Sequence, residues 1–318
     1  MKATPKDTSK NFHPMSLQRS IQVPASTTNL GAGFDVLGLA LQLYLRVDLQ
    51  VTSSSKPEFE LLGEGAHDLP ASEDNLLWKV TRRVFEGEKQ PVPGVRLKIE
   101  NQIPLARGLG SSAAAIVAGV SCFEALTGLE LSPDKFFHYA FEFENHPDNI
   151  TAARFGGFTV SAVAENGKVS FFRAPIAPKL KILLTVPEFR LETQKARAAI
   201  PRSLDLPDAV FNLQRSSLTV AALLRNEFHF LRESLRDRLH QPFRAPLIPG
   251  FEEILCLNQE EISGLMGICL SGAGPSVLAF AEGNLDEIYS RVEAIFERHG
   301  LRSRRFELEV DNEGRTIH

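Results

Sequence analysis

Apolar and polar residues alternate in short runs along much of the chain, which is the pattern of half-buried β-strands. Val95, Leu97 and Ile99, for example, alternate with charged residues. An Asn-Gly pair at 166–167 stands between two alternating runs and predicts a two-residue hairpin. Apolar runs predict four more strands in the second half of the chain, over 181–186, 267–271, 277–281 and 304–310.

Apolar residues spaced three or four apart predict the helices that separate these strands. The predicted helices cover 76–86, 111–126, 133–144, about 213–239 and 286–299. The third of them starts at Ser132 and Pro133, a capping hydroxyl followed by a proline, and we expect Pro147 to stop it. In the second half the order is strand, helix, strand, strand, helix, strand. This is the split βαβ order of ferredoxin-like domains.

The length of 318 residues favours two domains in an α+β protein. Pro175 and Pro178 mark the expected linker. We therefore predict a disordered polar tail over 1–16, a first domain over 17–175 and a second domain over 176–318. Within the first domain, the apolar run over 21–49 is interrupted by glycine and asparagine, and we interpret it as a strand, a long loop and a second strand.

Composition narrows the classes of function. The net charge is −4 and basic residues do not cluster, so we expect no nucleic-acid partner; Arg232, Arg236 and Arg238 are interpreted as the solvated side of a helix. No apolar run reaches 18 residues, so we expect no membrane partner. The three cysteines, Cys122, Cys256 and Cys269, lie far apart in apolar or helical segments. Neither a disulfide framework nor a zinc site is indicated, and a reducing, cytoplasmic location fits.

The segment IPLARGLGSSAAAIVAGV, residues 103–120, places two glycines and two serines between a predicted strand and a predicted helix. Its spacing G-x-G-x-x-A fits a dinucleotide site, but the following helix leads into another helix instead of the required strand. The lysine of a Walker A loop is also missing. A helix N-terminus with glycines before it still favours an anion. A plain helix start remains the alternative.

Two other segments have both a functional and a structural interpretation. SGAGPS, residues 271–276, lies between two strands and is either a ligand-binding loop or a glycine-rich hairpin. In FEFENHPDN, residues 141–149, Glu142 and Glu144 stand at the predicted end of a helix, where negative charge opposes the helix dipole. They are either ligands of a cation or solvated surface acids.

Taken in order, these segments resemble the homoserine kinases of the GHMP kinase superfamily. The resemblance runs from Val23 to Phe280, and six segments carry it: VPASTTNLGAGFDVLGLAL, IPLARGLGSSAAA, ENHPDN, RLETQKARAAIP, HQPFRAPLIPGF and SGAGPS. It implies a first domain like domain 2 of ribosomal protein S5, a ferredoxin-like second domain and an active site between them. The implied reaction is phosphorylation of the side-chain hydroxyl of L-homoserine by ATP, giving O-phospho-L-homoserine for threonine biosynthesis. A homodimer is implied as well.

By the same resemblance, residues are carried over to ATP and Mg²⁺. Ser112 and Glu144 would hold the metal, which agrees with the preference of Mg²⁺ for oxygen ligands. Asn75 is the candidate for the adenine pocket. The phosphates would contact the turn and the C-terminal glycine segment, namely Pro104, Leu105, Ala106, Arg107, Gly108, Leu109, Gly110, Ser111, Ser112, Ala113, Ala114, Ser271, Gly272 and Gly274.

The substrate residues follow in the same way. Asn29 and Asp35 would hold the ammonium group, Arg197 and Arg244 the carboxylate, and Asn149 the reacting hydroxyl, with His146 nearby. Ser112, Glu144, Asn149 and Arg197 form the predicted catalytic set. Mevalonate kinases have a catalytic aspartate seven residues before a Gly-Gly pair, where this chain has Asn149. An amide is no general base, so the resemblance implies transfer without one.

Some alternatives stay open. The family pattern differs from this chain at Asn145 and in the segments ASTTN and ITAAR. These differences bear on how the substrate is placed. Kinases of the same superfamily that act on shikimate, a sugar or an isoprenoid precursor are rivals, although a neutral sugar would not need two arginines. A binding protein that has lost catalysis should show a damaged metal pair or glycine turn, and both are present.

Overall fold

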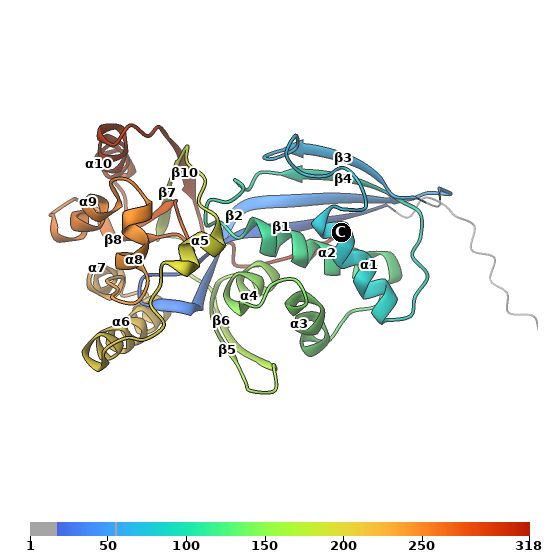
Figure 1. Cartoon of the computed structure of the whole chain (residues 1–318), viewed down its shortest axis with the longest axis horizontal. Helices are drawn as coiled ribbons and strands as arrows, with labels where there is room; N and C mark the ends of the chain where they lie inside the picture. Colours follow the sequence, from blue (N-terminus) through green and yellow to red (C-terminus); the bar gives the residue numbers. More distant parts are fainter. Residues whose placement is uncertain (1–17, 55) are drawn as a thin grey trace, which may run out of the picture.

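A computed structural model describes residues 18–54 and 56–318 as two β-sheets with helices packed on them (Figure 1). The predicted tail over 1–16 lies outside the described residues. The first sheet has seven strands in the order β11-β1-β2-β4-β3, with β5 paired to β2 and β6 to β5. Its strands are β1 (Gln18–Asn29), β2 (Gly33–Val51), β3 (Glu58–Gly63), β4 (Val95–Asn101), β5 (Phe158–Val163), β6 (Val169–Ala174) and β11 (Thr316–Ile317).

Four helices belong to this first sheet: α1 (Leu76–Gly87), α2 (Ser111–Thr127), α3 (Pro133–Phe141) and α4 (Pro147–Phe155). The sequence of α2 is nearly all apolar, and the helix is buried on almost every side against α1, α4 and β1. This burial fixes the direction in which the N-terminus of α2 points, which matters for the site.

The second sheet contains β7 (Lys181–Pro187), β8 (Leu265–Leu270), β9 (Val277–Ala281) and β10 (Ser303–Leu308) in the order β10-β7-β9-β8, all antiparallel. This is the sheet order of the predicted split βαβ arrangement, and the α+β fold class is confirmed. Its helices are α5 (Thr193–Ala198), α6 (Leu206–Arg225), α7 (Leu231–Ser234), α8 (Gln241–Arg244), α9 (Phe251–Cys256) and α10 (Leu285–Arg298). Among the described residues, no helix is both long and apolar enough to span a bilayer.

The two sheets share one apolar core. Leu37 and Leu39 of β2 belong to the same buried cluster as Leu184 of β7 and Phe280 of β9. A smaller cluster on the other face of the second sheet includes Ile268 and packs under α9 and α10. Because the core is continuous, the segments between the sheets are held in a fixed arrangement.

The β1–β2 hairpin differs from its prediction. The long loop expected within 21–49 is a turn of three residues, 30–32, and the surrounding glycines, serines and threonines lie in the strands. Small residues are needed because other segments approach closely. Gly31 has φ +68°, and a Cβ there would lie 2.2 Å from the carbonyl oxygen of Leu235. The hairpin tip therefore packs against the second half of the chain.

Other boundaries also shift. The helix predicted over 213–239 ends at Arg225, because Asn226 takes the left-handed conformation with φ +56°, and a 3₁₀ turn and α7 follow. The helix predicted to reach Glu144 ends at Phe141, and Pro147 begins α4 as its first residue. The last strand, β11, pairs with β1 in the first sheet, so the chain returns there after the second sheet. The division at 175/176 stays a prediction.

Candidate active site

A cavity between the two sheets brings together most of the residues that the sequence analysis selected. It is lined by Thr28, Asn29, Asp35, Ala106, Arg107, Gly108, Leu109, Gly110, Ser111, Ser112, Ala113, Glu144, His146, Asp148, Asn149, Thr193, Arg197, Arg244, Gly272 and Ala273. These residues come from the β1–β2 hairpin, the glycine turn and the start of α2, the α3–α4 connection and the start of α4, α5, α8 and the β8–β9 loop. Residues distant in sequence therefore face one space.

The glycine turn leads into the N-terminus of α2. Gly108 and Gly110 have φ +76° and +66°, a region open to glycine at little cost. A Cβ on Gly108 would lie 2.0 Å from the carbonyl oxygen of Ser271, and one on Gly110 would lie 2.1 Å from Ser26 Oγ. Gly110 caps α2 without any side-chain hydrogen bond. The first amides of the helix thus stay available to an anion at the positive end of its dipole.

The SGAGPS segment supports the glycine turn from the second sheet. The Ser271 hydroxyl lies 2.7 Å from the Gly108 carbonyl oxygen and 2.9 Å from Thr27 Oγ1. The Gly272 amide donates to the Thr28 carbonyl, and Asn29 Nδ2 donates to the Gly272 carbonyl at 2.8 Å. Gly272 lines the cavity, whereas Ser271 is fully buried behind it. The segment is thus the hairpin connection between β8 and β9, and its hydrogen bonds attach it to β1 and to the glycine turn.

Ser112 and Glu144, the predicted metal pair, both line the cavity. The Ser112 side chain is exposed in the first turn of α2, and Glu144 lies in the connection between α3 and α4. Glu144 Oε1 is 2.6 Å from His146 Nδ1, and this hydrogen bond raises the pKa of His146. Glu142 instead binds Arg83 through two hydrogen bonds, at 2.7 and 2.8 Å. The surface interpretation is therefore right for Glu142, while Glu144 remains the candidate metal ligand.

Asn149 is held by two hydroxyl groups of β1. Its Oδ1 accepts from Ser26 Oγ at 2.9 Å, and its Nδ2 donates to Thr28 Oγ1 at 3.3 Å. The neighbouring Asp148 is buried, and burial raises the pKa of its carboxyl from 3.8 to about 6. Four further residues line the cavity without having been predicted from the sequence, namely Thr28, Asp148, Thr193 and Ala273. Only their position beside motif residues could have indicated them.

Charged groups dominate the opposite wall. Arg197 and Asp35 form a bidentate ion pair, with Nη2–Oδ1 2.8 Å and Nη1–Oδ2 3.1 Å. Arg244 is buried, and no carboxylate among the described residues lies within ion-pairing distance of it. Burial, with a smaller contribution from Arg197, lowers the pKa of Arg244 to about 10. Both guanidinium groups lie beside the ring of Phe34, at 5.2 and 5.4 Å from its centroid.

A second, mostly apolar pocket adjoins the turn at Ser111 and Ser112. Its lining also includes Leu45, Leu61, Leu69, Asn75, Leu76, Leu77, Ile99, Asn101, Leu105 and Ala115. The Asn75 side chain accepts from the Leu77 amide at 3.1 Å and donates to the Pro70 carbonyl at 3.0 Å, so it caps α1. Pro104, Ala114 and Gly274 line neither pocket. An apolar slot of this kind suits a flat aromatic base.

The chain is similar to known proteins over nearly its whole length. Residues 75–157 match the family described as GHMP kinases N terminal domain. Homoserine kinase from Aquifex aeolicus is 41% identical over 300 residues, covering 94% of this chain and 99% of that protein. Homoserine kinase from Solibacter usitatus is 39% identical over 294 residues, covering 92% and 95%.

Solved structures agree. The crystal structure of homoserine kinase from Cytophaga hutchinsonii has a TM-score of 0.83 at 26% identity and covers 96% of this chain and 99% of that one. A crystal structure of mevalonate kinase, with a TM-score of 0.69 at 15% identity, covers 92% of this chain and 99% of that one and shows the shared fold alone. With relatives of this identity matched almost end to end, the chain belongs to the homoserine kinase family of GHMP kinases.

Proposed function

We propose that this protein transfers the γ-phosphoryl group of ATP to the side-chain hydroxyl of L-homoserine. The observation that carries the proposal is a cavity with an anion-binding helix N-terminus beside a wall of opposite charges. Arg244 is a buried cation without a carboxylate partner among the described residues, and Asp35 and Arg197 stand next to it. An α-amino acid carries one carboxylate and one ammonium group, which this wall complements.

The phosphates of ATP would contact Gly108, Gly110 and the first amides of α2, with adenine in the adjoining apolar pocket. Ser112 and Glu144 offer two oxygen ligands, which fits Mg²⁺ held by few protein groups together with phosphates and water. The chemistry that Mg²⁺ supplies when bound is neutralisation of charge on the phosphate oxygens. This role would account for the position of the Glu144 carboxylate, which lies between α3 and α4 and lines the cavity with the glycine turn.

At the substrate end, Arg244 and Arg197 would bind the carboxylate and Asp35 the ammonium group. The Asn29 side chain is already bound to Gly272 and to the Asp35 amide, so it orients the ammonium site through these contacts. Asn149 would orient the hydroxyl, because its own amide is fixed by Ser26 and Thr28. Since Asn149 supplies no base, the proton leaves late, and alignment of the reacting groups drives the transfer.

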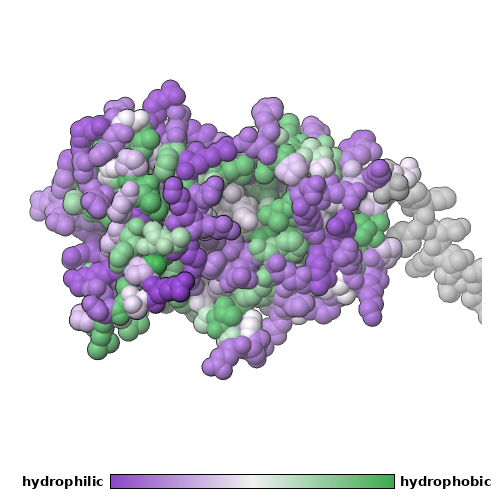
Figure 2. Space-filling view, in the orientation of Figure 1, coloured by the Kyte–Doolittle hydropathy of each residue, from purple (hydrophilic) through white to green (hydrophobic). Residues whose placement is uncertain are grey.

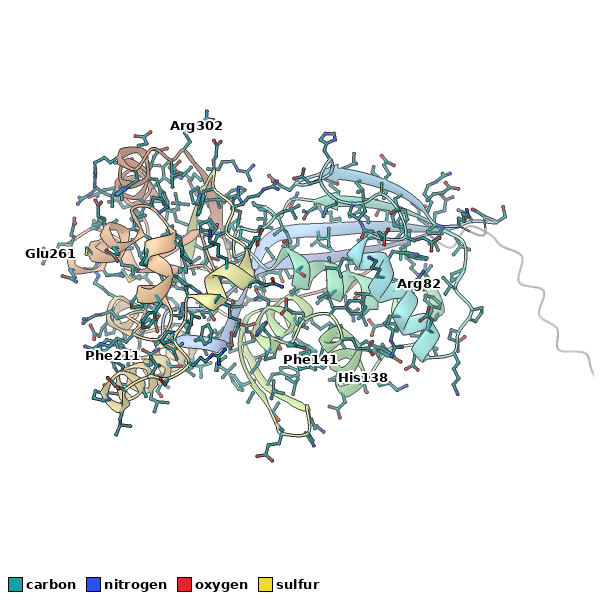
Figure 3. The ribbon with its side chains drawn as sticks, in the orientation of Figure 1. Arg82, His138, Phe141, Phe211, Glu261 and Arg302 are labelled. Carbon is teal, nitrogen blue, oxygen red and sulfur yellow. The ribbon has the colours of Figure 1, made fainter. Side chains whose placement is uncertain are left out.

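We infer a homodimer from α6. Leu206, Val210, Leu213 and Leu224 lie along one line of this helix, and 75% of Leu206 and 67% of Leu213 are exposed. The charges of α6 point elsewhere, since Arg215 binds Glu233 and lies over Phe211, which is labelled in Figure 3. Figure 2 shows green surface over α6 at the lower left. An uncharged stripe of this kind suits the same helix of a second copy.

Leu213→Asp tests the dimer. The wild type should elute as a dimer in size-exclusion chromatography with light scattering, and the variant should elute as a monomer. A monomeric wild type would contradict the inference.

The free thiols and the use of ATP favour a cytoplasmic location.

A coupled ADP-release assay tests the activity. Homoserine, shikimate, mevalonate and galactose are offered at equal concentration with ATP and Mg²⁺. We expect turnover with homoserine and little above background with the other three, because only homoserine carries both charges. Absence of a homoserine rate would overturn the proposed substrate, and turnover of another alcohol would replace it.

A further inference from the structure

A buried histidine that the proposed mechanism does not use contacts Arg244. His240 is the N-cap residue of α8, is fully buried, and has its ring 5.3 Å from the Phe34 ring. Its Nε2 lies 2.8 Å from the Gly31 carbonyl oxygen, and its Nδ1 lies 3.2 Å from Arg244 Nη1. The imidazole thus joins the hairpin tip to the cavity arginine.

These two neighbours determine the tautomer of His240. Arg244 has only donors and the Gly31 carbonyl only accepts, so Nδ1 must offer its lone pair and Nε2 must carry the hydrogen. The ring is then neutral. Burial lowers the pKa of His240, and Arg244 lowers it further, while Asp237, with Oδ2 3.6 Å from Nε2, and Asp35 oppose this shift. A protonated ring would donate from both nitrogens and lose Arg244.

The carboxylate of Asp237 holds this segment in place. It accepts hydrogen bonds from the His240 amide at 2.8 Å, the Leu239 amide at 2.9 Å and Asn212 Nδ2 at 2.6 Å. Its charge is therefore balanced mainly by backbone and amide donors, and it makes no hydrogen bond to the His240 ring in the part of the chain that the structure describes. Asp237 fixes the backbone from which His240 and Arg244 project.

The contacts of Arg244 leave one nitrogen for a ligand. Nη1 donates to the Gly272 carbonyl at 3.0 Å and to His240, and Nε points to the Ala196 carbonyl at 3.4 Å. Within the described residues Nη2 has no hydrogen-bond partner, and Arg244 lines the cavity beside Arg197. A guanidinium group bound on two of its three nitrogens presents the third in a fixed direction.

We propose that His240 is a positioning residue that orients Arg244 for the carboxylate of the substrate. His240 thereby determines the preference of the site for ligands that carry this carboxylate over analogues that lack it. The inference rests on the proposed function, because it assumes that a carboxylate binds at Arg244. His240 touches no reacting atom in this account.

Three variants separate the two hydrogen bonds of His240. His240→Asn keeps an acceptor near the position of Nδ1, His240→Gln keeps a donor near the position of Nε2, and His240→Phe keeps neither. For each we would measure KM for homoserine and competitive inhibition constants for two analogues. 3-Amino-1-propanol lacks the carboxylate, and 4-hydroxybutanoate lacks the ammonium group. KM for ATP and the thermal midpoint serve as readouts of general damage.

Loss of one hydrogen bond to a charged group should raise KM for homoserine about ten- to hundredfold in His240→Phe and His240→Gln. The inhibition constant of 4-hydroxybutanoate should rise by the same factor, while that of 3-amino-1-propanol and KM for ATP stay unchanged. His240→Asn should restore most of the lost affinity. His299→Gln, which alters an exposed histidine bound to Glu253, is the matched control and should change nothing.

Equal effects on both analogues, or no effect on homoserine, would overturn the inference. If His240→Phe does not fold, the comparison of His240→Asn with His240→Gln still tests the inference, since only His240→Asn keeps an acceptor for Arg244. A wild-type protein that turns over homoserine while the variants keep normal KM refutes the role of His240 alone. A wild-type protein inactive on homoserine refutes the proposed function instead.

Discussion

If Asp35 binds the ammonium group and Arg197 the carboxylate, as we propose, the ion pair between them should separate when homoserine binds. Asp35→Asn tests this. Asp35 has φ +57°, a conformation that asparagine also tolerates, so the backbone should not change. The hydrogen bond from the Asp35 amide to Asn29 Oδ1 does not depend on the side-chain charge.

The expected effects have opposite signs for two ligands. The side chains of Arg197 and Asp35 are 39% and 32% exposed, so their ion pair is worth only about 0.5–1 kcal/mol after solvent screening. An ammonium–carboxylate hydrogen bond in the cavity is worth about 1.5–3 kcal/mol. When homoserine binds to the variant, the ammonium–carboxylate hydrogen bond is lost, but the ion pair no longer has to be broken, so KM should rise about five- to thirtyfold. 4-Hydroxybutanoate has no ammonium group, so only the absence of the ion pair affects it, and it should bind about two- to fivefold more tightly.

Initial rates in the coupled assay give KM, and inhibition of homoserine turnover gives the constant for 4-hydroxybutanoate. Asp208→Asn, which removes the exposed ion pair to Arg238, is the control and should leave both values unchanged. Weaker binding of 4-hydroxybutanoate to Asp35→Asn would refute the reasoning, because the ion pair would then not compete with the ligand.

Three further predictions follow from the site and its surroundings. Glu144→Ala should abolish turnover at saturating Mg²⁺ with an unchanged circular dichroism melt; near-normal activity would remove Glu144 as metal ligand. Arg244→Leu should raise KM for homoserine while KM for ATP stays constant, and equal rises would argue against a carboxylate site. Asp148 has a folded-state pKa raised to about 6, so its stabilising contribution is complete below about pH 4 and is lost as the pH rises through 6. Asp148→Asn should therefore be more stable than wild type at pH 8, by up to about 3 kcal/mol, and equally stable near pH 4 in urea unfolding; the reverse order would refute this account of Asp148.

Much of the fold follows from local patterns in the sequence. The alternation at Val95, Leu97 and Ile99, the Asn-Gly hairpin and the cap at Ser132 all predict elements that the structure contains. These signals depend on the residue and its nearest neighbours. Elements that depend on distant contacts were not predicted, including β11, a strand of two residues that pairs with β1 from the other end of the described chain.

Composition predicted the wrong local structure where two segments of the chain pack closely against each other. Glycine and asparagine in the β1–β2 hairpin indicate a loop, yet Gly31 is small because Leu235 packs on it. The predicted helix over 213–239 is interrupted at Asn226, where no proline or glycine marks a break. In the cavity, Asp148 and Thr193 become candidates only when the fold brings them beside Arg197 and Asn149.

The return of the chain to its first sheet has a consequence for how the protein can be made. Ile317 pairs with Ile21, and the His318 carbonyl accepts from the Ser20 amide at 3.0 Å, so two segments at opposite ends of the described chain are adjacent in space. In the sequence, the strands of the second sheet are thus an insertion between β6 and β11 of the first sheet. Because β11 follows β10 in the chain, the first sheet is completed by a segment that is synthesised after the whole second sheet, and Arg315 beside β11 then reaches the buried Glu124. A gene permuted to open in the exposed hairpin turn at Asn166-Gly167 should keep every contact of the cavity.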